Sequence, residues 1–402
     1  MIFSLLKKNE KISLLLDIGN GTISAGLVSF VADSKPSLLY LTSIPFTSVE
    51  KPNSDKILLS MNTLLDEILT LITKKGTSQS YFKGKEVKIS SVLVSFSSPW
   101  FISRSRNIHL IQENAFIVTR KFIDNIIDTE KKIAEKELID SKYEHTFNNE
   151  IKIIESLIIN TKINGYPIED SIGKKTKIFD ASLYMSFVSK EVLDTVYKQI
   201  FKHTHIQQEN IHIHTFPLIS FTVIRDLFSA VDSFLFIDIT SEVTDITLVS
   251  NNAIIETVSF PSGRNFIIRQ IAKKFSVSNE IAESLLHIYK SRAADEETTL
   301  NMQSVISDIE KEWSIYFENA FMELSKEAIP PSYVYIMAES DVTALYNDFI
   351  KISKADNTSA YRKEINVVNI TENTLSGFYN GNKRFLPNDF IAMLAVFYNK
   401  IR

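Results

Sequence analysis

The residues with the clearest chemical potential lie in two segments, each at a point where an apolar run meets a polar turn. In the first, LLLDIGNGTISAGLVSF, an apolar run reaches Asp17, and a second apolar run begins after Thr22. Asp17 and Thr22 supply oxygen atoms, while Gly19 and Gly21 permit a tight turn close to a ligand. This pattern is typical of a strand–turn–strand hairpin whose turn holds phosphate.

The second segment, DITSEVTD, runs from Asp238 to Asp245 and repeats the order of apolar strand, aspartate, short turn and apolar strand. The two hairpins lie about 220 residues apart. Their similarity predicts a duplicated core. Glycine, however, occurs only 10 times in 402 residues, about 2.5% against roughly 7% in an average protein. The chain therefore has few glycines to spare for close approach to phosphate.

Composition bounds the class of protein. A chain of 402 residues is long for one core, so two or more lobes are expected. The net charge of −4 and the lack of a basic stripe argue against a nucleic-acid partner. There is no cysteine, which excludes disulfides and thiol chemistry and fits a reducing compartment. No apolar run reaches the roughly 18 residues of a membrane span, so a cytoplasmic protein is expected.

Local patterns place the hairpins on a mixed α/β framework. Residues 12–48 read as three strands, residues 54–75 have the apolar period of a helix, and residues 87–98 read as a further strand. These elements predict a sheet covered by helices. Residues 99–200 differ: short strands over 104–119, a charged helix from 120 and a strand ending in an Asn164–Gly165 turn predict an α+β insert.

The second half of the chain repeats this plan with more helix. Strands are expected over residues 233–260, and residues 265–328 read as mostly helical. SYVYIMAES, residues 332–340, reads as a strand that enters a helix, and NDFIAMLAVFYNKIR reads as a closing apolar helix.

The two aspartate-centred hairpins, the strand at 332–340 and the closing helix together resemble the actin-like ATPases. Among these, the match is with the bacterial division protein FtsA and the pilus assembly protein PilM. The insert at 99–200 lies where these proteins carry theirs, and Ile117–Arg120 and Ile158–Tyr166 resemble FtsA. The resemblance implies a two-lobed fold with a duplicated ribonuclease-H-like core and an α+β insert in the first lobe.

The same resemblance implies the domain boundaries. The expected domains are a first-lobe core at 1–98, completed by about 201–230 and 385–402, an insert at 99–200, a second-lobe core at 231–272 and 332–384, and a helical second-lobe subdomain at 273–331.

The resemblance also implies ATP with Mg²⁺ as the cofactor. In the family, the first aspartate works through Mg²⁺ and water, and backbone N–H groups of the turns face the phosphates. Asp17 and Asp238 would then lie at the metal. The residues expected to bind the cofactor are Asp17, Gly19, Asn20, Gly21, Thr22, Asp238, Thr244, Asp245, Gly263 and Glu283.

The second hairpin departs from the family pattern Asp-Ile-Gly-Gly-Gly-Thr-Thr-Asp-Ile. Thr240, Ser241 and Glu242 replace the three glycines. Thr240 and Val243 are β-branched, so a positive φ at either would be strained. Glu242 would bring a carboxylate toward phosphate, a repulsion of about 1 kcal/mol in water at 4 Å. The second phosphate motif therefore reads as degenerate.

The later motifs have drifted as well. Pro261–Arg264 keeps only the first glycine of a Pro-x-Gly-Gly stretch. Leu286 stands where the Ala-Glu-x-x-Lys helix has lysine, although Glu283 remains. At the adenosine, Ala338–Ser340 has no paired glycines. We therefore expect weak or no hydrolysis of any bound nucleotide.

Three functions remain open. The leading hypothesis is an FtsA-like scaffold of cell division at the cytoplasmic membrane face, which contacts the tubulin-like division protein FtsZ and self-associates into filaments or rings. The alternative is a PilM-like component that binds the tail of an inner-membrane pilus protein. A sugar or acetate kinase is the third reading, but the lost glycines argue against a kinase, which needs an intact phosphate cradle.

Membrane attachment and metal binding give two further expectations. FtsA proteins end in an amphipathic helix, whereas this sequence ends at Arg402, so attachment is expected through a partner or the N-terminal tip, Met1–Lys11. His212 and His214 alternate on an expected strand and share a face that could hold a metal. A structural role is favoured, because no carboxylate or cysteine stands at metal-ligand spacing.

Overall fold

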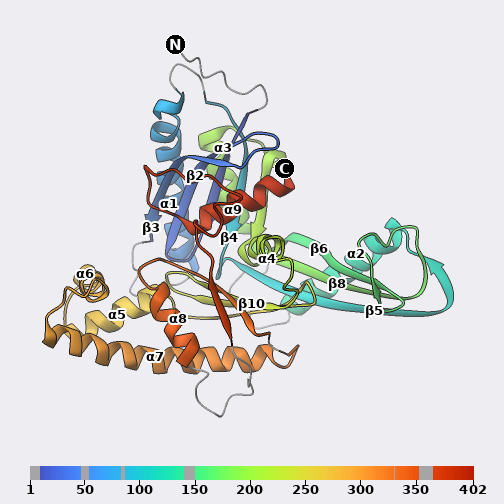
Figure 1. The fold of residues 1–402 in the computed structure, drawn as a ribbon. Helices are drawn as coiled ribbons and strands as arrows, with labels where there is room; N and C mark the ends of the chain where they lie inside the picture. The colour runs from blue at the N-terminus through green and yellow to red at the C-terminus, as the bar shows by residue number, and fades with distance from the viewer. Residues whose placement is uncertain (1–9, 47–53, 83–86, 140–149, 330, 353–364) are drawn as a thin grey trace. The chain divides into compact units, whose positions relative to one another are not determined.

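The structure is a computed structural model that describes residues 10–46, 54–82, 87–139, 150–329, 331–352 and 365–402 (Figure 1). The chain forms two compact units. Unit 1 comprises Met1–Asp232, Asn251–Glu256 and Glu372–Arg402, and unit 2 comprises Ser233–Ser250 and Thr257–Thr371. Residues 1–9 of the predicted N-terminal tip lie outside the described residues, and Lys11 begins the first strand.

A five-stranded sheet forms the centre of unit 1, in the order β3-β2-β1-β4-β9. Strand β1 is antiparallel to β2 and parallel to β4, which is parallel to β9. Every residue of β1 after Lys11 is buried, as expected for a strand covered on both faces. The strands are β1 (Lys11–Ile18), β2 (Thr22–Phe30), β3 (Ser37–Pro45), β4 (Ile89–Phe96) and β9 (Ile211–Thr215).

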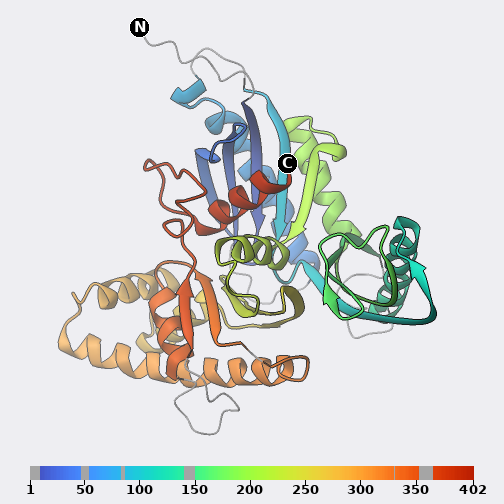
Figure 2. The same cartoon turned by 45° about the vertical axis from the view of Figure 1, so that its right-hand side comes forward.

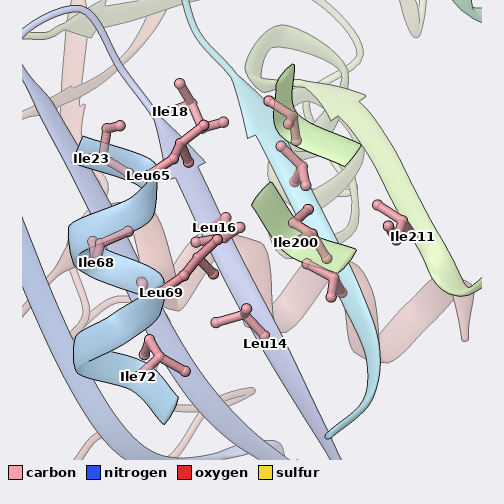
Figure 3. Packing of buried hydrophobic residues seen from close by; sticks show 14 of the residues in the cluster. Leu14, Leu16, Ile18, Ile23, Leu65, Ile68, Leu69, Ile72, Ile200 and Ile211 are labelled. Carbon is pink, nitrogen blue, oxygen red and sulfur yellow. The ribbon is translucent and has the colours of Figure 1, made fainter. Parts of the chain in front are cut away.

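Helices cover both faces of this sheet. Leu14, Leu16 and Ile18 of β1 pack with apolar residues of α1 (Ser54–Leu71) and α3 (Lys190–Thr204) (Figure 3). The opposite face carries α4 (Phe216–Leu227) and α9 (Asp389–Ile401), which contact each other through Phe216 and Phe390. Because side chains alternate along a strand, Asp17 points to the face opposite α1.

The insert is an antiparallel sheet of order β5-β8-β6-β7 with helix α2 (Arg120–Ile139) packed on it (Figure 2). Its strands are β5 (Phe101–Ile117), β6 (Ile151–Ile163), β7 (Tyr166–Pro167) and β8 (Lys175–Ser189). The prediction of several short strands over 104–119 was wrong, because β5 is one strand of 17 residues that follows β8 along its length. The Asn164–Gly165 turn is confirmed, and both residues have a positive φ.

Unit 2 repeats the sheet of unit 1. Its strand order is β12-β11-β10-β13-β14, with β10 antiparallel to β11 and parallel to β13, which is parallel to β14. The two sheets therefore share one connection plan, and the predicted duplication is confirmed. The strands are β10 (Phe234–Ile239), β11 (Thr244–Ser250), β12 (Ala253–Phe260), β13 (Tyr333–Ala338) and β14 (Asn366–Asn369). The first four residues of β12 fall within unit 1 as defined above.

The helices of unit 2 are α5 (Arg264–Phe275), α6 (Asn279–Lys290), α7 (Glu296–Leu324) and α8 (Thr343–Ile352). Their packing centres on an aromatic cluster. Trp313 of α7 is fully buried and contacts Tyr346 and Phe349 of α8, with ring centroids 5.5 Å and 6.0 Å away. No helix in the described part of the chain combines the length and apolar character that a membrane span requires.

A buried carboxylate joins the insert to the core of unit 1. Glu155 of β6 is 4% exposed. Its oxygens accept hydrogen bonds from the backbone N–H of Thr215 (3.1 Å), the hydroxyl of Thr215 (2.7 Å) and the hydroxyl of Ser186 (2.5 Å). Nδ1 of His214 lies 2.9 Å from Oε1. One side chain thereby connects strands β6 and β8 of the insert with β9 of the core sheet.

We expect Glu155→Ala to destabilise the protein by about 3 kcal/mol, because it leaves several buried donors without an acceptor. Urea unfolding followed by circular dichroism measures the change. Glu150→Ala is the matched control: Glu150 is an exposed carboxylate just before β6 that pairs with Lys190 (2.7 Å), and the loss of an exposed ion pair should change stability by less than about 1 kcal/mol. Equal effects of the two substitutions would contradict the anchoring role of Glu155.

Candidate functional site

The loop after β1 is a closed turn held by its own lobe. The N–H of Gly19 donates to the carbonyl of Thr22 (3.1 Å), and the carbonyl of Gly21 accepts from Phe46 N (2.8 Å). Trp100 Nε1 donates to the Gly19 carbonyl (2.7 Å). The side-chain amide of Asn20 donates to the Ser98 carbonyl (2.9 Å), so this side chain secures the loop. The structure thus brings Asp17, Gly19, Asn20, Gly21 and Thr22 together in one turn.

The position of Gly19 is tightly packed within the turn. A Cβ there would lie 3.0 Å from the Thr22 carbonyl oxygen. Neither Gly19 nor Gly21 has a positive φ. A side chain at position 19 would therefore require the Thr22 carbonyl to shift by a few tenths of an ångström, and the turn does not use the left-handed conformation that favours glycine.

Asp17 is a buried carboxyl at the end of β1. Its side chain is 7% exposed, and Oδ1 has no hydrogen-bond partner among the described residues. Burial raises the pKa of Asp17 to about 7, while the neighbouring Ser95 hydroxyl on β4 acts in the opposite direction. A buried oxygen without a protein partner suits a water molecule or a hydrated metal ion.

The loop after β10 closes in the same way with different residues. Thr240 N donates to the Val243 carbonyl at 3.0 Å, the counterpart of the Gly19–Thr22 bond. None of the residues from Thr240 to Val243 has a positive φ, so the strain expected from β-branched residues is absent. The loss of glycine has therefore left the backbone turn intact, and the two loops differ in their side chains.

The predicted acids of this hairpin lie together. Asp238 and Asp245 stand directly opposite each other in the β10–β11 ladder, and both are buried. Thr244 is fully buried, and its hydroxyl donates to the Ser262 carbonyl (2.7 Å), next to Gly263. The hairpin is thereby joined to the segment that leads into α5.

Helix α5 begins against the second loop. The N–H groups of Arg264 and Asn265 donate to the carbonyls of Thr240 (3.0 Å) and Ser241 (2.7 Å). A Cβ on Gly263 would lie 2.3 Å from the Thr240 oxygen, which no side chain could occupy. The donors at this helix end, which in other proteins receive anions, are used by the chain itself.

The carboxylate of Glu242 faces α5. It accepts hydrogen bonds from Arg269 Nη1 (2.8 Å) and from the side-chain amide of Asn265 (2.9 Å). The sequence analysis expected Glu242 to oppose phosphate. In the structure its charge is instead paired with Arg269 on the helix.

Arg264 is the centre of an acidic cluster in unit 2, which we call the Arg264 cluster: Arg264, Glu283, Glu339 and Asp341. The guanidinium lies 2.9 Å from Glu283 Oε1 through Nη1, 2.8 Å from Asp341 Oδ2 through Nη2 and 3.2 Å from Glu339 Oε2 through Nε. The Arg264 side chain is 16% exposed. Glu283, predicted to contact the cofactor, is thus held by an arginine of the same unit.

The pKa directions follow from this packing. Although burial opposes it, the carboxylates of Asp341, Glu339 and Glu283 hold the pKa of the Arg264 guanidinium above its ordinary value. The pKa of Glu339 lies above its ordinary value. Burial is the main cause and the Asp341 charge adds to it, while the Arg264 charge acts in the opposite direction. With the three acids ionised, three negative charges and one positive charge leave the cluster at −2.

Sequence reasoning did not identify the partners of Arg264. Arg264 stands where the family pattern has its second glycine, and Glu339 lies where the pattern has paired glycines. An arginine and an acid that replace glycines in two motifs of one site form a compensating pair. The presence of these two opposite charges at motif positions was the feature of the sequence that could have predicted their contact.

ATP with Mg²⁺ fits the two hairpins unequally. In unit 1, the buried Oδ1 of Asp17 suits water around a metal ion. In unit 2, the helix donors next to Gly263 are already bonded to loop carbonyls, and the Arg264 cluster is negative. A phosphate chain would meet acidic side chains rather than free N–H groups. The residues of unit 2 therefore do not fit ATP with Mg²⁺.

The histidines have protein partners. His203 Nε2 lies 2.7 Å from Asp66, and His214 contacts Glu155, while His212 packs near Tyr398. Among the described residues, no group of three or more His, Cys, Asp or Glu side chains could hold a metal ion.

A groove lies between the insert and the core of unit 1. Its volume is about 420 Å³, and its walls come from β6, α3 and β9. Asp194 and Tyr197 of α3 also line an adjoining hollow of about 440 Å³. The lining combines apolar side chains from all three elements with charged side chains from β6 and α3. The lining residues include Lys152, Ile153, Ile154, Lys190, Leu193, Asp194, Tyr197, Ile211 and Ile213.

No protein-family model matches the chain, and no curated protein matches it by sequence. Solved structures do match. A chain of the PilM–PilN type IV pilus biogenesis complex shares 14% sequence identity, with 97% of this chain and 98% of that chain covered and a TM-score of 0.65. This likeness establishes a common fold along nearly the whole chain.

Two further structures match less well. The ethanolamine utilization protein EutJ from Carboxydothermus hydrogenoformans has 11% identity and a TM-score of 0.45, with 90% of this chain and 85% of that chain covered. A Bacteroides thetaiotaomicron protein of unknown function with an actin-like ATPase fold has 8% identity and a TM-score of 0.42, with 96% of each chain covered.

We expect the free energy of unfolding of Asp17→Asn, relative to that of wild type, to increase as the pH rises. The folded state raises the pKa of Asp17 from its ordinary value near 4 to about 7, so the stability that the protonated form supplies is present below pH 4, is lost progressively as the pH rises to about 7 and does not change above that. Asparagine does not ionise, so the variant should gain about 3 kcal/mol on wild type between about pH 5 and about pH 8. Urea unfolding at the two pH values tests this, with exposed Asp33→Asn as control. A pH-independent difference would refute the burial argument.

Gly263→Ala should destabilise the protein by about 2 kcal/mol or more, because the added methyl group would overlap the Thr240 carbonyl. Thermal unfolding measures the loss. Gly377→Ala is the matched control, since no atom lies within 4 Å of the position that its added methyl group would take and its φ is not positive. If both variants unfold at the wild-type temperature, the close approach of α5 to the second loop does not exist.

Proposed function

We propose that this chain, which has the actin-like ATPase fold, is a PilM-like adaptor that binds the cytoplasmic tail of an inner-membrane protein. The observation that carries the proposal is the groove between the insert and the core of unit 1. The likeness to a chain of the PilM–PilN complex, which includes the insert, supports it. The chain would then act at the cytoplasmic face of the membrane, held there by its partner.

The groove suits an extended peptide. Strand β9 is the last strand of its sheet in the described structure. The N–H groups of Ile211 and Thr215 are bonded to Gln208 and Glu155, so we propose that a peptide pairs with the backbone between these two residues. The side chains of Ile211 and Ile213 belong to the apolar part of the groove lining. Among the lining residues, Lys152 provides positive charge and Asp194 negative charge, which would fix the direction and register of a peptide with matching charges, while Lys190 is paired with Glu150 (2.7 Å).

The division scaffold, first among the sequence hypotheses, has less support. The resemblance to FtsA rests on short motifs, whereas the structural likeness to the pilus protein extends over the whole chain. In the adaptor proposal, the chain functions by binding other proteins, and turnover of ATP is not required. Self-association into rings remains compatible with this role.

Binding can be measured with a fluorescent synthetic peptide copied from the cytoplasmic tail of a PilN-type inner-membrane protein of the same cell. We expect Asp194→Arg to weaken binding at least tenfold, because it reverses a charge in the lining and places a larger side chain in the groove. Asp348→Arg, the same substitution at an exposed site on α8 in unit 2, should leave the affinity unchanged. Equal affinity for all three proteins, or no binding to wild type, would overturn the proposal.

A further inference from the structure

The Arg264 cluster connects the elements of unit 2 that a nucleotide would otherwise contact. Arg264 opens α5 and donates its N–H to Thr240 of the second loop. Its side chain reaches Glu283 on α6 and Asp341 at the approach to α8. One residue thus joins the hairpin loop, two helices and the end of β13.

We infer that Arg264 is an internal substitute for a nucleotide in unit 2: it neutralises and cross-links the acids there, and the unit reaches its final form without ATP. Three kinds of contact support this assignment. The helix donors are bonded to loop carbonyls, the space beside Gly263 is filled by the Thr240 carbonyl, and Glu283 is engaged by the guanidinium.

The chemistry of arginine explains why one residue can take this role. A guanidinium carries five N–H donors in a fixed plane, enough to bond several carboxylates at once. The cluster is mostly shielded from water at Arg264, so its ion pairs are screened less than exposed ones. Removal of the arginine would leave three acids close together without a counter-ion, and their repulsion would push α6 and α8 away from the loop.

The negative charge of the Arg264 cluster would also oppose the binding of a polyphosphate. With Arg264 present the cluster still has a net charge of −2 when its acids are ionised. The ammonium group of Lys290 donates to the Ser340 carbonyl (3.0 Å) and keeps its charge, so the surroundings, with Lys290 counted, still have a net charge of −1. A triphosphate would have to displace an ion pair and approach a negative surface, both of which oppose binding.

Two measurements on the full chain test the inference. The first is thermal unfolding and calorimetric titration of wild type with millimolar Mg-ATP. We expect no change in Tm and no saturable heat, whereas a nucleotide with micromolar affinity would raise Tm by several degrees. A saturable rise in Tm or a binding isotherm would overturn the inference.

The second measurement concerns Arg264 itself. We expect Arg264→Ala to lower Tm by about 5 °C or more and Arg264→Lys to lower it by less, because lysine keeps the charge but loses the planar fork. Arg269→Ala is the matched control: this more exposed arginine on the same helix holds one acid, and its loss should shift Tm by about 1 °C. A Tm for Arg264→Ala equal to that of the control would refute the role of Arg264.

A charge-neutralising variant separates ion pairing from simple packing. In the Arg264→Ala background, Glu283→Gln with Asp341→Asn should recover part of the lost Tm, because two unpaired negative charges are removed. If Arg264→Ala does not fold, Arg264→Lys serves as the background. If Tm does not recover in either background, Arg264 does not stabilise unit 2 by neutralising these acids.

Discussion

The buried carboxylate of Glu155 is the constraint on which the proposed binding groove depends. The groove has one wall on the insert and another on the core sheet, so its shape depends on how these two parts meet. A carboxylate removed from water must be fully hydrogen-bonded, and the donors of Glu155 come from both parts: Ser186 on β8 and Thr215 at the end of β9. Any shift of the insert would break these bonds, which makes the groove a fixed feature of unit 1.

The two sheets are more alike in the backbone geometry of their hairpin loops than in the charged side chains around those loops. Both hairpin loops close with the same bond between the first N–H and the fourth carbonyl, although one begins with Gly19 and the other with Thr240. Glycine is therefore not what the turn itself requires in unit 2. What changed there is the surrounding charge: Glu242 pairs with Arg269, and Arg264 holds its own acids.

Much of the fold could be predicted from the sequence, because apolar strands and helix periods are local signals. The strands of both sheets other than β14, the α+β insert and the closing helix were found in this way. The long strand β5 was not, since polar residues interrupt its apolar pattern and its continuity depends on β8. Within the candidate site, the motif positions of the hairpins were readable, whereas the contact between Arg264 and Asp341, 77 residues apart, depends on tertiary folding.

The difference between the two units suggests how an actin-like fold can serve as an adaptor. A site that waits for a nucleotide must keep N–H donors and positive charge available, and it is incomplete until the ligand arrives. In unit 2 the N–H groups of Arg264 and Asn265 are bonded to loop carbonyls, and the guanidinium is bonded to acids. Polar groups satisfied in this way stabilise one conformation without a ligand. In unit 1 the bonds of Glu155 fix the proposed groove in a similar way, so a partner that bound there would not have to supply the free energy of ordering it.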